Sequence, residues 1–366
     1  VLDVERASPE DLRKYANETF APLGDDRAKV DLYVSWSLRL QRGQEYLEAI
    51  VNQTQVIGGT CIGIARHKEI RTLQFDLCIV DEASKAAATE ALVPLVRSKR
   101  WVMVGDQRQL PPFQEDALRD KALLEEFGLD ENELRSTLFD RMLNGLPDHS
   151  KKSLRVQRRM TEAIGEMVSE CFYDSQLVSR GPEPMDEILG VLTRPITWWS
   201  TSSLPKHHEM PGGYDGKSFS NPAESRAVKD ILLRLLFARN ALKVNEPLEI
   251  LVIAPYSAQV NDLNRQISGV ASQLQEKGVR IEVNSIDAVQ GREADLVIFS
   301  TVRSNENSRV GFLDSDKRIN VALSRARKGL IIVGDSMFLS SAQSPFKDVL
   351  SFIDRRPKWA RIETLS

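Results

Sequence analysis

The chain has 366 residues, of which 42% are hydrophobic and 28% charged, and this balance is that of a globular protein with about two domains. The net charge of −3 excludes a basic field over the whole molecule, so any nucleic-acid binding must come from local patches. The three cysteines have no disulfide or zinc spacing, and no apolar run reaches the ~20 residues of a membrane span. We therefore expect an intracellular protein, cytoplasmic or nuclear (nucleoid), with no membrane partner.

The first 53 residues show helical patterns. Residues 8–20 begin with Ser8 as a helix N-cap and Pro9 at the first helical position. Residues 25–52 continue with helical periodicity and no strand pattern. We expect residues 1–53 to form a helical segment, and because the chain begins at Val1 we expect it to be a piece of a longer protein.

From residue 54 the pattern changes to short apolar runs that end in Gly, Asp or Ser. The runs TQVIGGTC, LCIVDE and RWVMVGD are separated by helical stretches, which predicts buried parallel strands in an α/β domain. The turn-rich stretch NGLPDHSKK at residues 144–152 is a candidate boundary. The first domain is therefore predicted to cover residues 54–150.

The same alternation restarts after this boundary. Strand candidates are ITWWS, EILVIAPY, RIEVNSI, DLVIFSTV and GLIIVGD. A helix between the first two has Asn221 as N-cap, Pro222 in its first turn and Glu224 at capping-box spacing. Residues 202–218, which contain the neighbouring His207 and His208, are expected to form a loop and not a metal site. A second α/β domain is predicted over residues 151–366.

Two adjacent carboxylates follow the strand in FDLCIVDEAS. Open α/β sheets place their ligands at the carboxyl ends of their strands, which is where Asp81 lies. Nucleotide-hydrolysing sites use such a pair as a Mg²⁺ ligand, here Asp81, and as a group that polarises the attacking water, here Glu82. The simpler interpretation is that two acids end a strand.

Such a site also needs a phosphate loop of the form G-x-x-x-x-G-K-[ST]. In GGTCIGIA, Gly58 and Gly63 have the glycine spacing, but Ile64 and Ala65 replace the lysine and hydroxyl residues. In PGGYDGKS, Pro211 stands where the first glycine belongs, and proline has no N–H to offer a phosphate. Neither stretch is expected to bind phosphate.

Five further motifs complete an ordered set. They are GDQRQLPP, LRVQRRM, IAPYSAQ, SIDAVQGREAD and INVALSRAR, and the last is expected to place Arg325 and Arg327 on a short helix. Taken singly, they could be tight turns or solvated charged faces. Together with VDEAS and GGTCIGI they resemble motifs Ic to VI of superfamily 1 helicases, in the 5′-to-3′ group that includes the nonsense-mediated-decay helicase.

The resemblance covers about residues 54–336 and departs from the family pattern at a few positions. Gln107 stands where Pro is more frequent, Arg158 replaces a Tyr, and Ser324 replaces a Thr. The resemblance implies a fold of two RecA-like lobes with parallel sheets, in which the first lobe is incomplete at its N-terminus and a helical segment precedes it. It also implies ATP and Mg²⁺ as cofactors.

The resemblance further implies a role for each matching residue. Asp81 would hold Mg²⁺, Glu82 would activate water, and Gln109 would sense the γ-phosphate. Arg159 and Arg325 would act as arginine fingers on the triphosphate, because a planar guanidinium fits its charge. Gly291 and Glu293 would lie at the nucleotide, with Glu293 at the ribose. Thr60, Pro111, Tyr256 and Arg303 would contact single-stranded nucleic acid, either DNA or RNA.

In this family the phosphate loop precedes motif II, and here no such loop precedes Asp81. We therefore expect a fragment of an ATP-dependent helicase or translocase that needs the upstream part of the same protein and is inactive alone. One alternative is a non-catalytic nucleic-acid-binding or interaction module. Another is a metal-dependent nuclease built on Asp76, Asp81 and Glu82.

Overall fold

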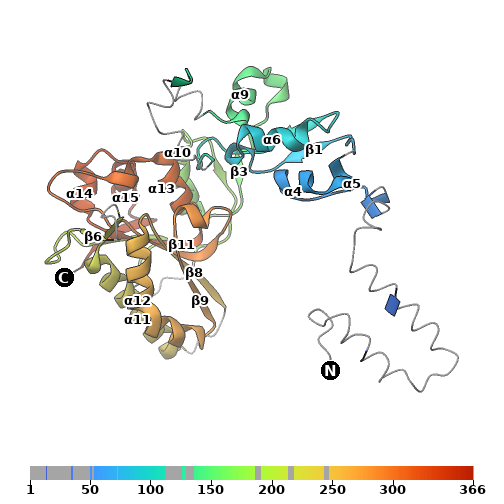
Figure 1. The fold of residues 1–366 in the computed structure, drawn as a ribbon. Coiled ribbons are helices and arrows are strands. Elements are labelled where there is room, and N and C mark those ends of the chain that lie inside the picture. Colours follow the sequence, from blue (N-terminus) through green and yellow to red (C-terminus); the bar gives the residue numbers. More distant parts are fainter. Residues whose placement is uncertain are drawn as a thin grey trace. The chain divides into compact units, whose positions relative to one another are not determined.

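The computed structural model describes residues 14, 34–35, 50–51, 53–71, 73–112, 126–128, 136–185, 191–212, 218–242 and 247–365 (Figure 1). The chain divides into two compact units. The first unit is Val1–Gly105 with Thr137–Phe139, and the second is Asp106–Ser136 with Asp140–Ser366. The expected helical segment 1–53 lies almost entirely outside the described residues. The expected domain divisions at residues 53 and 150 stay predictions.

The first unit contains a small parallel sheet. The elements of this unit are α4 (Cys61–Arg66), α5 (Lys68–Arg71), β1 (Cys78–Val80), the 3-10 helix η2 (Ala83–Lys85), α6 (Ala88–Leu95) and β2 (Trp101–Met103), and the sheet consists of β1 and β2. The two strands pair in parallel with Cys78 opposite Trp101, as their patterns predict. The expectation that both strands are buried is wrong, because Ile79 is 65% exposed and Val102 is 46% exposed. Helix α6 contacts β1, whereas these alternate side chains point to solvent.

The stretch TQVIGGTC does not form the predicted strand. Residues 54–60 are irregular and mostly exposed, and Thr60 is instead the N-cap of α4. Its hydroxyl accepts a hydrogen bond from the Gly63 N–H at 3.0 Å. A threonine followed by helix-compatible residues caps a helix more readily than it extends a strand that has no neighbour to pair with.

The second unit is built on a six-stranded parallel sheet of order β12-β5-β11-β10-β8-β9. These strands are β5 (Ile196–Ser200), β8 (Leu248–Ala254), β9 (Val279–Ser285), β10 (Ala294–Ser300), β11 (Ala326–Gly334) and β12 (Ala360–Thr364). All five strands predicted for this part of the chain are present, and the predicted α/β class is confirmed. The sequence patterns do not predict β12, because it is a partly exposed edge strand with charged residues and lacks the apolar run of a buried strand.

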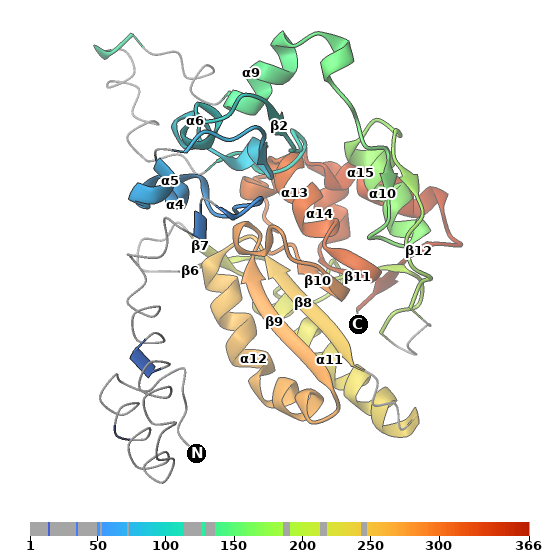
Figure 2. The same ribbon diagram turned by 90° about the vertical axis from the view of Figure 1, so that its right-hand side faces the viewer.

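Helices cover both faces of this sheet (Figure 2). On one face lie α10 (Glu162–Phe172), α13 (Asp316–Leu323), α14 (Ser336–Ser341) and α15 (Phe346–Arg355), and on the other lie α11 (Pro222–Leu242) and α12 (Ser257–Gln275). Along β10, Val297 and Phe299 belong to the first core, and Leu296 and Ile298 belong to the second. This alternation explains why the central strands read as continuous apolar runs.

Short elements connect these layers. They are α9 (Leu138–Gly145), β3 (Val156–Gln157), β4 (Val178–Ser179), β6 (Met210–Gly212), β7 (Ser218–Ser220) and the 3-10 helices η4 (Asp148–Ser150), η5 (Asp287–Val289) and η6 (Gly311–Asp314). Pro211 and Ser218, the ends of PGGYDGKS, lie in the antiparallel pair β6–β7, and residues 213–217 lie outside the described residues. Among the described helices, none has the length and apolar content needed to cross a membrane.

Helix α11 begins at the predicted cap but not with a capping box. The Asn221 side chain accepts hydrogen bonds from the N–H groups of Ala223 and Glu224, at 3.1 and 3.2 Å. The Asn221 N–H, however, donates to Gln259 and not to Glu224. The Glu224 carboxylate is instead directed at the end of β10, where it accepts hydrogen bonds from Ser300 and Val302.

Trp198 provides a test of the first core. Its ring is fully buried, its Nε1 donates to the Gly334 carbonyl at 3.0 Å, and it makes a T-shaped contact with Phe346. We expect Trp198→Phe to lower the free energy of unfolding by about 1–3 kcal/mol, through lost packing and one lost hydrogen bond. Denaturant unfolding measures this, and Phe237→Leu, at a residue that is 75% exposed, should change stability by less than about 0.5 kcal/mol.

Candidate functional site

The backbone after β1 presents two exposed carboxylates in the first unit. Asp81 and Glu82 are both exposed, and Glu82 adopts a left-handed conformation with φ of 53°. Its N–H donates to Asp81 Oδ1 at 3.0 Å. The next residue, Ala83, is bonded to the Val104 carbonyl after β2 at 2.8 Å. This turn is therefore fixed to both strand ends, and it holds the two carboxylates in solvent.

A side chain at Gly105 would disrupt this turn. An added Cβ would lie 2.8 Å from the backbone nitrogen of Ser84. Glycine is therefore required where the segment after β2 passes under the turn that follows β1.

The Asp81 carboxylate is compatible with Mg²⁺ bound to a nucleotide. Mg²⁺ usually takes one or two carboxylates and completes its shell with water and phosphate oxygens. The described residues contain no group of three or more His, Cys, Asp or Glu side chains that could hold a metal unaided. The geometry thus fits an ion that arrives with phosphates better than an ion held by protein alone.

The nuclease alternative is weakened by the position of Asp76. Asp76 precedes β1 and Asp81 follows it, so the two residues are separated by roughly 16 Å at ~3.3 Å per residue. Asp76 also forms an ion pair with Lys99 at 2.7 Å, and this hydrogen bond holds its pKa below the ordinary value. The three acids do not form one metal site.

The segment that follows β2 is anchored within the second unit. Gln109 Nε2 and the Tyr173 hydroxyl both donate to Asp106 Oδ2, at 2.8 and 2.5 Å. Asn320 of α13 donates to the Tyr173 hydroxyl at 3.0 Å and to the Arg108 carbonyl at 2.8 Å. Burial raises the pKa of Tyr173, which keeps this hydroxyl a donor. Gln109 is thereby connected through Asp106 and Tyr173 to the helix that precedes Arg325.

Two arginines flank one carboxylate at the amino-terminal edge of the second sheet. Arg159 Nε lies 2.9 Å and Arg327 Nε lies 3.7 Å from the Glu293 carboxylate, and all three side chains are 37–44% exposed. The backbone bonds Ala294 N–H to Arg325 carbonyl and Thr161 N–H to Arg327 carbonyl bring these segments together. One positive charge therefore remains uncompensated within this group of three residues.

Arg325 occupies a different environment. It is 1% exposed, and its guanidinium donates to the carbonyls of Val321 and Arg292. The expected short helix carrying both arginines is wrong, because α13 ends at Leu323 and Arg327 lies on β11. In this structure Arg327, and not Arg325, shares the exposed position of Arg159.

Gly291 lies two residues before Glu293 and has φ of 82°. No atom lies within 4 Å of a Cβ added there, so the left-handed backbone alone explains the glycine. A pocket of about 260 Å³ opens beside it, at the amino-terminal ends of β8, β9 and β10, and is lined by residues that include Glu282, Arg292 and Glu293.

At the opposite, carboxyl-terminal edge, the predicted nucleic-acid residues Tyr256 and Arg303 are buried. Tyr256 is 4% exposed and Arg303 is 5% exposed. The Arg303 guanidinium donates to the Arg309 carbonyl, pairs with Glu209 at 3.3 Å and lies 4.2 Å from the Phe219 ring centroid. Both residues therefore lie beneath the surface. The other two predicted contacts, Thr60 in the first unit and Pro111 in the second, are exposed.

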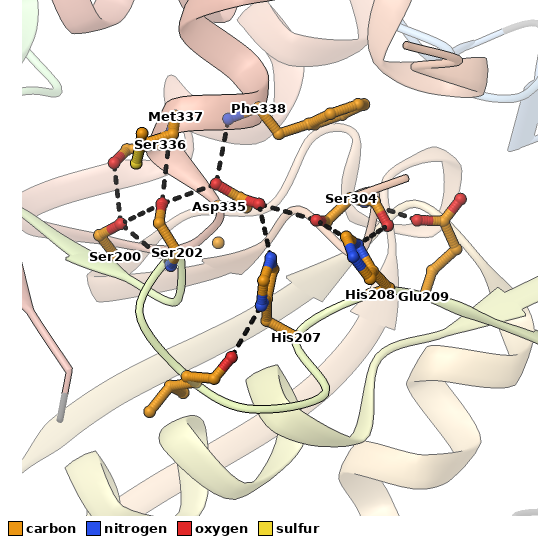
Figure 3. Close-up of polar contacts among 12 residues, drawn as sticks. Ser200, Ser202, His207, His208, Glu209, Ser304, Asp335, Ser336, Met337 and Phe338 are labelled. Carbon is orange, nitrogen blue, oxygen red and sulfur yellow. Dashed lines mark hydrogen bonds and ion pairs between the residues drawn. The ribbon is translucent and has the colours of Figure 1, made fainter. Parts of the chain in front are cut away.

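A polar cluster around Asp335 joins the loops at this edge (Figure 3). The Asp335 carboxylate accepts hydrogen bonds from Ser202, Ser304 and the Phe338 N–H, at 2.6, 2.7 and 3.0 Å, and His207 lies 3.4 Å away. Burial acts to raise the pKa of Asp335, but these contacts outweigh it and hold the pKa below the ordinary value. His207 and His208 are thus loop residues, as predicted.

Glu224 holds Val302, the second residue after the end of β10, in a strained conformation. Val302 is fully buried with φ of 72°, a region that β-branched residues rarely adopt. Its N–H donates to both Glu224 oxygens, at 3.0 and 2.8 Å, and Ser300 donates at 2.6 Å. Burial raises the pKa of Glu224 to about 8, against the opposing effect of these hydrogen bonds.

Comparisons with known proteins place the chain in a family. Two family models, each described as an AAA domain, match residues 134–337 and 13–114. The DNA polymerase alpha-associated DNA helicase A of Schizosaccharomyces pombe is 31% identical over 323 residues, which are 83% of this chain and 44% of that protein. The Regulator of nonsense transcripts 1 homolog of Neurospora crassa is 31% identical over 84% of this chain and 27% of its own length.

The ATP-dependent helicase NAM7 of Saccharomyces cerevisiae is 32% identical over 80% of this chain and 28% of its own length. The chain belongs to the superfamily 1 helicases, in the group of the nonsense-mediated-decay helicase. It spans less than half the length of these three relatives. Among solved structures, the PRRSV helicase is 17% identical with a TM-score of 0.33, over 70% of this chain and 34% of that chain.

The sequence patterns assigned no role to Tyr173, Asn320 or Arg327. Tyr173 ends a helix, Asn320 lies within the INVALSRAR motif, and Arg327 follows Arg325 by two residues. Side chains two residues apart in a strand point to the same face of the sheet, so a strand predicted from residue 326 onward could have indicated that Arg325 and Arg327 share a face. It could not have indicated which of them is exposed, because Arg325 is covered by residues from other segments.

The pH dependence of stability should report the buried carboxyl of this helicase chain. Because the pKa of Glu224 is raised to about 8, its folded form keeps a proton that the unfolded form releases near pH 4.5. Stability from this group is therefore full below about pH 4.5 and is lost, by up to ~1.4 kcal/mol per pH unit, as pH rises to 8. Glu224→Gln cannot ionise, so its stability deficit relative to wild type should shrink from pH 5 to pH 8.

Chemical denaturation at pH 5, 6, 7 and 8 measures this deficit. Glu306→Gln, at an exposed position, is the control and should show a small, constant difference. A constant deficit for Glu224→Gln would mean that the carboxylate stays ionised throughout and is held by its hydrogen-bond donors.

Proposed function

We propose that this chain supplies most of the ATP-hydrolysing and strand-binding core of a helicase or translocase that acts on single-stranded DNA or RNA. The observation that supports this most is the division of charged groups between two compact units. The exposed carboxylates Asp81 and Glu82 belong to the first, and the arginines around Glu293 belong to the second. In this proposal hydrolysis requires both sets of groups, which would couple ATP turnover to motion of the protein.

Each group has a role in this proposal. Asp81 would hold Mg²⁺, which would supply positive charge to offset that of the phosphates. Glu82 accepts the proton of the attacking water, and its exposure allows water to reach it. Arg159 and Arg327 contact the triphosphate. Gln109, whose side chain donates a hydrogen bond to Asp106, senses the γ-phosphate. Gly291 and Glu293 border the nucleotide, with Glu293 at the ribose.

The chain contains no G-x-x-x-x-G-K-[ST] sequence, so a backbone cradle for the phosphates has to come from elsewhere. The stretch GGTCIGIA enters the short helix α4 without a preceding strand. We propose that the upstream part of the same helicase supplies this loop, and that the chain alone binds ATP weakly. The alternative is a non-catalytic nucleic-acid-binding or interaction module, which would not need a phosphate loop.

ATP turnover by the chain, with and without single-stranded DNA and RNA, is the first test. We expect detectable strand binding but little stimulated turnover, because the phosphates lack their cradle, and Glu82→Gln serves as the matched control. Strong stimulated turnover that disappears in Glu82→Gln would contradict the missing phosphate site. Absence of both turnover and strand binding would contradict the strand-binding proposal.

The arginines can be separated by their different effects. Arg159→Ala and Arg327→Ala should each lower the free energy of unfolding by at most about 1 kcal/mol, because their ion pairs are half-exposed. Each substitution should abolish any residual ATP turnover, because one arginine at the triphosphate can contribute ~10³–10⁵ in rate. Arg325→Ala should lower the unfolding free energy by about 2–4 kcal/mol, because it leaves buried carbonyls without donors.

Thermal unfolding and turnover should be measured on the same protein preparations. Arg355→Ala, which breaks an ion pair with Glu170 on α10, is the control for a lost surface arginine. Loss of turnover in Arg325→Ala at unchanged stability would restore Arg325 as the residue that contacts the triphosphate.

A further inference from the structure

Phe312 is a large aromatic side chain left at the surface of the second unit. It lies in η6, between β10 and α13, and is 45% exposed, although its neighbours Val310 and Leu313 are buried in the core. An aromatic ring usually buries its area when the local packing allows it. An exposed ring on an otherwise buried segment therefore requires another explanation.

The ring is held in place from the protein side. The Tyr256 ring stacks on Phe312, with centroids 5.1 Å apart and an interplanar angle of 24°. The Tyr256 hydroxyl accepts the Phe312 N–H at 3.3 Å. Gly311 has φ of 58°, and a Cβ at this residue would lie 2.4 Å from the Tyr256 hydroxyl. The backbone at Gly311 is thus shaped to bring Phe312 onto Tyr256.

Tyr256 is in turn fixed by its own neighbours. It makes a T-shaped contact with Phe219 at 5.4 Å, and Arg303 Nη1 lies 3.5 Å from its hydroxyl. Arg303 follows the Val302 turn, which the Glu224 carboxylate holds. A buried, hydrogen-bonded layer therefore supports one exposed aromatic ring. Such an arrangement reduces the entropy that ordering a contact residue on binding would cost.

A positive charge lies beside this ring. The Arg318 guanidinium carbon is 4.7 Å from the Phe312 ring centroid. In the described part of the chain, Arg318 forms no ion pair, and its backbone N–H bonds to Ser315. Asp314 and Asp316 are exposed nearby in sequence, and the contacts of the described residues do not pair either with Arg318. The guanidinium is thus available to an anion.

We propose that Phe312 stacks on one base of a single-stranded nucleic acid while Arg318 binds the adjacent phosphate. This inference rests on the proposed strand-binding function and names a contact for it. Every base has a π-face, so an aromatic platform binds bases without regard to sequence. Tyr256 and Arg303 then act from beneath, as residues that position Phe312, and do not touch the strand themselves.

Equilibrium binding of fluorescent single-stranded oligo-dT and oligo-rU, measured by anisotropy without ATP, tests the stacking contact. Phe312→Ala should weaken binding about 5- to 100-fold, the usual contribution of one stacked base. Phe312→Leu keeps apolar packing on Tyr256 but lacks a π-face, so it should lose a similar factor while remaining folded. Phe312→Trp should keep wild-type affinity, and Phe237→Ala, at an exposed phenylalanine of α11, should have no effect.

The salt dependence of the same binding isolates the charge. Arg318→Ala should reduce the slope of log K against log salt concentration by about 0.7, the value for one phosphate contact on a single strand. Phe312→Leu should leave that slope unchanged, and Arg355→Ala should change neither slope nor affinity. An unchanged slope in Arg318→Ala would overturn the phosphate contact.

The outcomes separate this inference from the proposed function. If wild type binds strands and Phe312→Leu binds them equally well, the inference is overturned and the proposed function stands. If wild type binds neither oligonucleotide, both are overturned. Weaker binding in Phe312→Leu and Phe312→Ala, with retention in Phe312→Trp, is the expected result.

Discussion

The structure of the second unit depends on burying a parallel sheet on both of its faces. Helices cover each face, so side chains of the central strands must be apolar whichever way they point, as Leu296 to Phe299 are. Polar side chains are thereby confined to the strand ends. Because β10 has seven residues, its two end residues lie roughly 20 Å apart at ~3.3 Å per residue. The sheet therefore separates two chemically different edges.

At the amino-terminal edge Arg159, Glu293 and Arg327 are half-exposed, whereas Glu224, Arg303 and Asp335 at the carboxyl-terminal edge are buried. The ion pairs of Glu293 with Arg159 and Arg327 can be broken to bind a ligand at a small cost in free energy, because half-exposed ion pairs contribute little to stability. Glu224 and Asp335, by contrast, accept hydrogen bonds from several loops and hold them rigid. Under the proposed function, this difference would suit a nucleotide that is bound and released at one edge and a preformed surface at the other.

Local pattern was a reliable guide wherever local interactions decide the outcome. Apolar runs, cap chemistry and turn residues correctly predicted five strands of the six-stranded sheet, the Asn221 cap and the loop at His207. It failed at TQVIGGTC, where an apolar run without a partner strand became a helix cap at Thr60. It failed again at Glu224, which was predicted to complete a capping box but accepts hydrogen bonds from the backbone N–H of Val302 in a strained turn. In the first case the strand had no non-local partner to pair with. In the second case a non-local hydrogen-bond partner outweighed the local preference for a capping box.

The sequence by itself determined the α/β class, the helicase family and the presence of the carboxylates and arginines, because these depend on residue types in a fixed order. Only the tertiary structure decided which of these side chains are exposed. Arg325 and Arg327 are chemically identical and two residues apart, yet packing from other segments buries one and leaves the other in solvent. Exposure is a property of the assembled fold, and the same reason places Tyr256 beneath the surface and Phe312 upon it.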